Sequence, residues 1–234
     1  QYDRAEIKKS IIQNNIYGVD IEKGAVDIAR LRFWLSIVVD EETPSPLPNL
    51  DYKIMQGNSL IESFMGMDLS KLTYEKEHKE DKGEISLFDD EKNRLQKTVS
   101  HLLSSYYSCS DHDRKVTLQQ EISDTINKQL EAQAYNPSIL AKLKEINLAE
   151  NNKFFLWHTW FSDVFSRDDK EGFDIVIGNP PYIGEKGHKE IFQPVKADIH
   201  LGQYYLGKMD YFYFFFHLAF NMLSPNGVTT FITT

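Results

Sequence analysis

The chain has 234 residues, 41% of them hydrophobic and 26% charged, which is ordinary for a globular protein and enough for one domain with an appendage. Its formal net charge of -9 argues against a surface that grips nucleic acid throughout, because Lys and Arg contacts to phosphate dominate that kind of binding. Cys109 is the only cysteine, which excludes an intrachain disulfide and a cysteine-rich metal site and indicates a reducing cytoplasm.

The first forty residues predict a helix, a strand and a second helix. Isoleucines among charged residues at 1–14 fit an amphipathic helix, the run IYGVDI at 16–21 fits a strand, and apolar residues recur at near-helical spacing over Gly24–Val39. Asp20 lies at the carboxyl end of the strand, where nucleoside-binding α/β folds place a carboxylate on ribose hydroxyls. The alternative is a carboxylate that caps the next helix or merely ends the strand.

Residues 40–50 contain three prolines and predict a loop, and Tyr52–Gln56 then reads as a second strand, followed by Gly57, Asn58 and Ser59. The composition becomes charged and polar from about residue 70 to residue 150, with helical periodicity. Its most polar part, Lys71–Asp90, reads as a loop.

Two apolar stripes follow this loop, separated by a break at residues 108–113. They consist of Leu95, Val99, Leu102, Leu103 and Tyr106, and of Leu118, Ile122, Ile126 and Leu130. The stripes predict an antiparallel helical hairpin with packing seams, and Asn136 with Pro137 starts a third helix. Because the residues outside the seams carry both signs of charge, we expect a contact element between proteins or domains that does not read DNA sequence.

An aromatic run, FFLWHTWFSDVF, occupies residues 154–165 and reads mainly as core, with His158 as a structural histidine.

The apolar, β-branched run Phe173–Ile177 then predicts a strand covered on both faces of a parallel sheet. Gly178 ends it, and two prolines turn the chain out of the sheet. Ligands bind beyond the carboxyl ends of such strands, where Asn179 and Tyr182 stand. A plain turn with a neighbouring aromatic is the alternative.

The tetrad Asn-Pro-Pro-Tyr at 179–182 resembles the motif of DNA methyltransferases that act on the N6 amine of adenine and use S-adenosylmethionine. The resemblance implies that the target base is rotated out of the duplex. It implies that the Asn179 side-chain oxygen and the Pro180 carbonyl accept hydrogen bonds from the amine and orient its lone pair toward the methyl group. Pro181 completes the catalytic motif, and Tyr182 would stack on the flipped base.

The segment GVDI, followed by a helix containing Ala-Arg-Leu-Arg, looks like the second cofactor motif of large restriction-modification methyltransferases. By that resemblance Asp20 holds the cofactor ribose and Ile21 lies against its adenine. The third motif commonly has Asp where this chain has Asn58, whose oxygen can still accept from the adenine amine without charge assistance. Ser59 is assigned to the cofactor with it, and a plain turn at Asn58 is the alternative. The Phe-Leu-Trp-His run is typical of combined restriction-and-modification enzymes.

After Tyr182, residues 183–208 read as a loop long enough for a lid or a substrate-contacting segment. Its basic residues either meet phosphates or are solvated surface charges; they are Lys186, His188, Lys189 and Lys196.

Residues 210–223 predict a buried helix, and their aromatic run is too short for a membrane span of about 20 residues. A Ser-Pro-Asn-Gly turn ends that helix, and residues 228–234 predict another strand.

The elements together predict an α/β fold: a partial, doubly wound Rossmann-like methyltransferase sheet with an α-helical hairpin insertion. We expect the catalytic core at residues 1–70 and 150–234 and the insertion at 71–149. The function implied by the resemblance is site-specific adenine methylation in a bacterial restriction-modification enzyme. The expected partners are double-stranded DNA and the rest of a longer polypeptide. We do not expect the chain to bind a membrane.

Two rival functions stay open. One is a methyltransferase that acts on protein glutamine or RNA with the same tetrad, and the other is a non-catalytic DNA-binding or assembly module that works through the hairpin. The family's cofactor site also begins with a strand and a Gly-rich loop, centrally placed between the strands at 16–21 and 173–178, and neither occurs here. We therefore expect a central fragment that alone neither binds S-adenosylmethionine tightly nor methylates, with the DNA-gripping surface elsewhere in the parent protein.

Overall fold

The computed structural model describes residues 3–41, 43, 45–72, 87–133, 136–167 and 170–233. The chain forms two compact units, each built from two stretches of sequence. The first unit consists of Gln1–Asn58 and Lys71–Asn152, and the second of Ser59–Ser70 and Lys153–Thr234. Most of the expected polar loop at 71–90 lies outside the described residues, but its last four residues already belong to a helix.

The first unit begins with α1 (Arg4–Asn15), β1 (Gly18–Asp20), α2 (Lys23–Val38) and β2 (Ile54–Gln56). Asp3 caps α1 by accepting a hydrogen bond from the backbone nitrogen of Ala5 at 2.9 Å. The two strands pair in parallel, with Asp20 opposite Gln56. The elements pack around a small apolar core that contains Ile12, Val26, Ile37, Leu50 and Ile54. The predicted order of elements is confirmed, although both strands are shorter than predicted.

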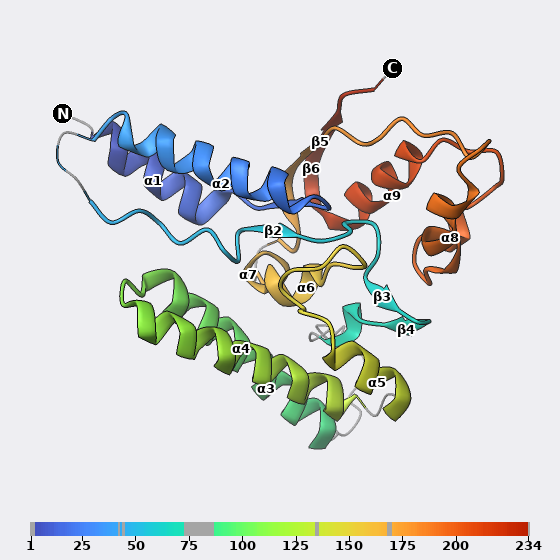
Figure 1. Ribbon diagram of the computed structural model, residues 1–234, viewed down its shortest axis with the longest axis horizontal. Helices are drawn as coiled ribbons and strands as arrows, with labels where there is room; N and C mark the ends of the chain where they lie inside the picture. The colour runs from blue at the N-terminus through green and yellow to red at the C-terminus, as the bar shows by residue number, and fades with distance from the viewer. Residues whose placement is uncertain are drawn as a thin grey trace. The chain divides into compact units, whose positions relative to one another are not determined.

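The same unit contains α3 (Leu87–Ser108), α4 (His112–Ala132) and α5 (Pro137–Lys144). The first two run antiparallel, as Figure 1 shows in green. Asp111 and Asn136 cap α4 and α5 through their side-chain oxygens, which accept from backbone nitrogens. The seam is buried as predicted, through Leu95, Val99, Leu103, Tyr106, Leu118, Ile122, Ile126 and Leu130. The predicted hairpin and third helix are therefore confirmed.

Hydrogen bonds fasten the end of this hairpin to the segment that leads into β2. The Asn49 amide donates to the carbonyls of Tyr106 at 2.8 Å and Cys109 at 2.9 Å, at the end of α3, where carbonyls have no further helical turn to accept from. The Tyr107 hydroxyl donates to the carbonyl of Tyr52 at 3.0 Å. The hairpin is thus part of the compact unit that carries β1 and β2.

The second unit contains two strands from its first stretch and the remaining elements from its second. These are β3 (Ser63–Phe64), β4 (Met67–Asp68), α6 (Trp157–Trp160), α7 (Ser162–Phe165), β5 (Phe173–Gly178), α8 (Lys189–Ala197), η2 (Gly202–Tyr204), α9 (Phe212–Met222) and β6 (Leu223–Phe231). A 3-10 turn, η1 (Ser70–Leu72), lies where the chain returns to the first unit. The aromatic run forms the core as predicted, with Phe154, Phe155, Trp160 and Phe161 buried.

The strand before the Asn-Pro-Pro-Tyr tetrad is not covered on both faces, so that prediction was wrong. Side chains of Ile175 and Ile177 are 67% and 73% exposed. The reason is that β5 pairs in parallel with β6, and no described element packs on the face that these isoleucines share. An apolar, β-branched sequence reports strand propensity and not what covers the strand.

The Ser-Pro-Asn-Gly turn lies inside β6 and does not precede it. Strand pairing jumps from Phe173 opposite Leu223 to Ile175 opposite Val228, so residues 224–227 bulge out of the ladder. Gly227 permits this bulge, because a Cβ there would stand 2.8 Å from the Phe173 carbonyl oxygen. The turn residues therefore bend a strand that starts directly after α9.

Two further predictions need correction. The helix α9 buries only one side, since Phe214 and Met222 are buried whereas Phe220 is largely exposed. Residues 183–208 are not a structureless loop, because they contain α8 and η2.

The described strands form two parallel pairs, β1–β2 and β5–β6, and one antiparallel pair, β3–β4, in a mixed α/β structure. Within the described ranges, no helix is both long and apolar enough to cross a bilayer.

Candidate functional site

The first unit places three of the predicted cofactor residues at the ends of two neighbouring strands, β1 and β2. Asp20 is exposed at the end of β1, and its Oδ1 accepts from the backbone nitrogen of Glu22 at 2.8 Å. Ile21, beside it, is half exposed, and its carbonyl accepts from the Gln56 amide at 3.0 Å. Asn58 follows β2 after Gly57, whose nitrogen donates to the Asp20 carbonyl at 2.9 Å. Parallel pairing thus places a carboxylate, an apolar side chain and an amide at neighbouring strand ends.

Ser59 belongs to the second unit, in which its carbonyl accepts from the Trp157 indole at 2.9 Å. The predicted cofactor residues therefore divide between the units at the bond between Asn58 and Ser59. In Asp20, the contact with Glu22 shows that the strand-end carboxylate also orders the start of α2. No side chain caps α2 itself, whose N-cap residue is Glu22, so this Asp20 oxygen fits the strand-end alternative and not the capping one.

The tetrad at 179–182 leaves the end of β5. Gly178 pairs with Phe231 of β6, and a Cβ at Gly178 would stand 2.8 Å from the Phe231 ring. Asn179 and Pro181 are exposed, and Pro180 is buried. The strand end therefore presents an amide side chain to solvent while the first proline anchors the turn.

Tyr182 is held at two points and is 44% exposed. Its hydroxyl donates to the carbonyl of Ile232, directly after β6. Its ring meets the Phe212 ring edge-on, with centroids 6.2 Å apart. A fixed and partly exposed aromatic ring therefore stands three residues beyond Asn179.

The chain after Tyr182 pairs with the chain before α9. Tyr211 donates its backbone nitrogen to the Ile183 carbonyl at 2.8 Å, and Glu185 donates its own to the Met209 carbonyl at 3.0 Å. Between them Gly184 faces Asp210 in an antiparallel bridge. Residues 183–211, which we call the clamp segment, are consequently closed at their base.

Glu185 is a buried carboxylate inside the clamp segment. Lys196 Nζ lies 2.6 Å from its Oε1 and the Tyr205 hydroxyl 2.5 Å, and the Lys208 backbone nitrogen donates to Oε2 at 2.6 Å. The hydrogen bond from Lys196, followed by that from Tyr205, lowers the pKa of Glu185 to about 2. Lys196 is therefore committed to an internal ion pair, whereas Lys186 and Lys189 are exposed.

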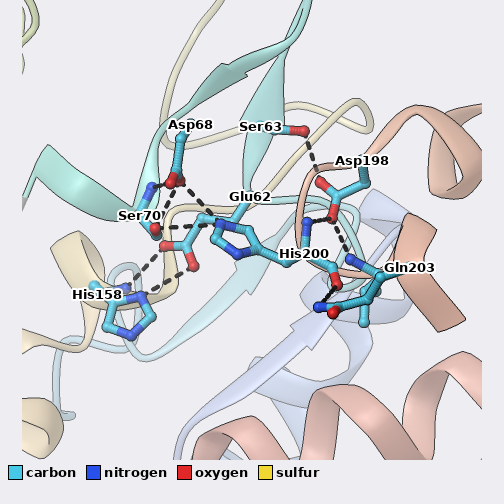
Figure 2. Close-up of polar contacts among 9 residues, drawn as sticks. Glu62, Ser63, Asp68, Ser70, His158, Asp198, His200 and Gln203 are labelled. Carbon is cyan, nitrogen blue, oxygen red and sulfur yellow. Dashed lines mark hydrogen bonds and ion pairs between the residues drawn. The ribbon is translucent and has the colours of Figure 1, made fainter.

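A second polar cluster joins β3 and β4 to α6 and to the residues after α8 (Figure 2). Glu62 is buried and accepts from the His158 backbone nitrogen at 3.1 Å, with His158 Nδ1 3.0 Å from its other oxygen. Asp198 is buried and accepts from the Ser63 hydroxyl at 2.6 Å. His200 Nε2 lies 3.0 Å from Asp68 Oδ1.

The carboxylates set the charge state of this cluster. Burial alone would lower the pKa of His158, but the negative charge of Glu62 and its hydrogen bond raise it above the ordinary value. Burial would raise the pKa of Asp68, whereas hydrogen bonds from Ser70 and His200 lower it. In the part of the chain that the structure describes, no three acidic, histidine or cysteine residues group as a metal site requires.

Sequence reasoning missed Glu185 and Glu62. Both are buried glutamates whose partners lie far along the chain, so no local pattern separates them from exposed ones. The one available signal was position, since Glu185 follows the tetrad after only Ile183 and Gly184. His158 was correctly interpreted as a structural histidine.

Comparison with known proteins adds the family. The profile of the Eco57I restriction-modification methylase family matches residues 14–234, which include both candidate strand ends. The chain belongs to this family. A Methanocaldococcus jannaschii protein, named as a type II restriction enzyme and methyltransferase, is 27% identical to this Eco57I-family chain over 222 residues. The match covers 75% of the chain and 18% of that relative, so the chain spans less than a fifth of the relative's length. No solved structure matches the chain.

Proposed function

We propose that this chain is the central part of a longer restriction-modification enzyme that methylates the N6 amine of adenine in double-stranded DNA, using S-adenosylmethionine. The tetrad at the end of β5 carries the proposal. It presents an exposed amide at Asn179 and a fixed aromatic ring at Tyr182, which are the groups that recognition of a flipped adenine requires. The family match supports methyl transfer in a restriction-modification setting.

The residues at the end of β1 and β2 fit the adenosine part of the cofactor. The exposed Asp20 carboxylate suits ribose hydroxyls, the Ile21 side chain suits an adenine face, and the Asn58 amide suits an exocyclic amine. S-adenosylmethionine, when bound, supplies an electrophilic methyl group. We assign Ser59 to the same ligand on its position next to Asn58.

In this proposal the protein orients the acceptor amine. The Asn179 side-chain oxygen and the Pro180 carbonyl each accept a hydrogen bond from one of its N–H groups, which orients the nitrogen lone pair toward the methyl group. Tyr182 stacks on the base and holds it out of the duplex. Pro181 keeps the tetrad extended, because its ring fixes φ and restricts the residue before it.

The rival functions have weaker support. Methylation of protein glutamine or RNA would use the same tetrad, but the family and the relative's name point to restriction and modification, which act on DNA. A non-catalytic assembly module working through α3 and α4 would leave the exposed Asn179 without a role. The apolar face of that hairpin is also already buried within the chain.

Replacing Asn179 tests the proposal. We expect Asn179→Ala in the full-length protein to reduce adenine methylation by on the order of 100-fold or more, because one preorganised hydrogen-bond acceptor is lost. Asn221→Ala, an exposed amide on α9, is the matched control and should keep full activity. Incorporation of labelled methyl groups into duplex DNA measures both, with circular dichroism to verify folding. Activity of Asn179→Ala near that of the control would refute the assignment.

A further inference from the structure

The clamp segment carries an apolar side chain that projects from a tightly held turn. Leu206 is 87% exposed, more than any other large hydrophobic side chain in the described part of the chain. It lies in the turn Tyr205–Lys208, in which Gly207 and Lys208 both have positive φ, at 81° and 55°. A left-handed conformation at a lysine is uncommon and persists only where the surroundings enforce it.

One carboxylate enforces this turn from both sides. Glu185 accepts from the Tyr205 hydroxyl, before Leu206, and from the Lys208 backbone nitrogen, after it. The Leu206 nitrogen itself contacts Met209 Sδ at 3.1 Å. Lys196 Nζ, which pairs with Glu185, lies 4.1 Å from the Tyr205 ring centroid. The backbone of the turn is therefore fixed, although the Leu206 side chain at its tip is exposed to solvent.

The turn is also rigidly linked to the tetrad. Glu185 is three residues beyond Tyr182 on the same backbone, and the bridge between Gly184 and Asp210 joins the two stems of the clamp segment. Any shift of the turn therefore acts on the backbone that carries Tyr182. Leu206 itself is 24 residues beyond Tyr182, but the carboxylate that holds its turn is only three residues beyond the proposed base-binding ring.

The charge of the clamp segment suits DNA better than the rest of the chain does. Residues 183–211 contain four lysines and four acidic residues, so the segment is neutral in a chain of net charge -9. Two of the acids, Glu185 and Asp198, are buried and hydrogen-bonded inside the fold. Lys186, Lys189 and Lys208 are exposed. Glu190 and Asp210 are exposed as well, so the segment as a whole repels phosphates less than the average of this acidic chain.

We propose that the turn Tyr205–Lys208 enters the DNA beside the target adenine and that Leu206 fills the space which the flipped base leaves. The inference rests on the proposed function. A flipped base leaves a gap in the stack, and apolar wedges such as leucine stabilise opened base steps. Glu185 is the positioning residue of this turn, because its hydrogen bonds with the Tyr205 hydroxyl and the Lys208 backbone nitrogen hold the turn in shape.

The test compares a paired target with one that is already open. The full-length protein is assayed on a duplex carrying its recognition sequence, and on the same duplex with an abasic site opposite the target adenine. We expect Leu206→Ala to slow methylation of the paired duplex roughly 10-fold or more, since opening a pair costs a few kcal/mol, and to approach wild type on the abasic duplex. Glu185→Gln should show the same rescue. Ile199→Ala, another exposed aliphatic side chain of the segment, is the control and should match wild type on both.

Each other outcome overturns the inference. Equal rates for Leu206→Ala and wild type on the paired duplex would show that the turn does not aid base opening. An equal loss on both duplexes would show that Leu206 acts elsewhere, for example in contact with a protein partner. If the wild-type protein methylates neither duplex, the proposed function itself is wrong. The inference that the turn enters DNA then loses its basis as well.

Discussion

Tyr182 shows how one side chain can be both fixed and available. Its hydroxyl donates a hydrogen bond to the Ile232 carbonyl and its ring contacts the Phe212 ring, yet part of the Tyr182 side chain stays exposed. A ring held in this way loses little entropy when a base stacks on it. The hydroxyl therefore orients the ring, which the tetrad alone did not reveal.

We expect Tyr182→Phe to keep stacking but to lower methylation about 3- to 10-fold, the value of one net hydrogen bond. Tyr182→Ala should cost more, because stacking is worth roughly 1 to 3 kcal/mol per base. Fluorescence of 2-aminopurine at the target position reports capture of the flipped base. Identical signals from wild type and Tyr182→Ala would contradict base stacking.

The Glu62–His158 pair predicts a pH dependence of stability. The pKa of His158 is raised in the folded state, so the stabilisation is fully present below the ordinary histidine pKa of about 6.5 and is lost as pH rises through the folded value. We expect Tm to fall as pH rises above about 6.5 and through the raised pKa of His158. Glu62→Gln keeps an acceptor for the His158 nitrogen but removes the charge, so this slope should flatten.

His188→Gln is the control for that experiment, because His188 is exposed and the carboxylate of Glu190 lies 4.0 Å from it. Its slope should equal that of wild type. If Glu62→Gln keeps the wild-type slope as well, another group governs the pH dependence.

At the scale of elements, the end of β5 is shaped by a missing side chain. Gly178→Ala would bring a Cβ to 2.8 Å from the Phe231 ring, so we expect a loss of about 1 to 3 kcal/mol in the free energy of unfolding. Phe231→Leu in the same protein should recover part of that loss, which a double-mutant cycle measures.

Gly24→Ala provides the opposite case. Gly24 lies in α2, and no atom stands within 4 Å of the position that an alanine Cβ would take there, so alanine should stabilise the helix by up to about 1 kcal/mol. Thermal unfolding of the three variants compares them directly. If Gly178→Ala leaves the free energy of unfolding unchanged, the Phe231 ring moves aside without cost.

The helices were the most predictable elements. Apolar stripes predicted α3 and α4, and Asn136 with Pro137 predicted the start of α5, because helix formation follows local spacing. The strand order around Asp20 and Asn58 also followed from apolar runs that end in polar residues. Their assignments to the cofactor stay predictions.

Features that depend on distant pairings were not predictable. The exposed face of β5, the bulge in β6 and the one-sided burial of α9 depend on which elements pack where, and sequence period does not report this. The Glu185 contacts join residues up to 23 positions apart, and those of Glu62 join residues 96 apart. Such polar contacts leave no repeating pattern in the chain.

At the scale of the whole molecule, the two parallel strand pairs limit what the chain does by itself. In the described ranges β1 pairs only with β2, and β5 only with β6. Of the residues we assign to the cofactor, Asp20, Ile21 and Asn58 all face its adenosine part in our proposal, and Ser59 is assigned only by its position next to Asn58. We therefore expect calorimetric titration of the isolated chain with S-adenosylmethionine to show only weak binding. A low-micromolar dissociation constant would show that the chain also holds the sulfonium end.

The division of the second unit has a consequence for synthesis on the ribosome. Ser59–Ser70, which contains β3 and β4, is made well before Lys153, where the rest of that unit begins. Glu62, Ser63 and Asp68 then lack the partners that hold them in the finished protein. At roughly 5 to 20 residues per second, the newly made strands β3 and β4 wait several seconds while α3 and α4 are synthesised. Codons that slow translation before Lys153 would therefore lengthen the time for which Glu62, Ser63 and Asp68 stand without their partners.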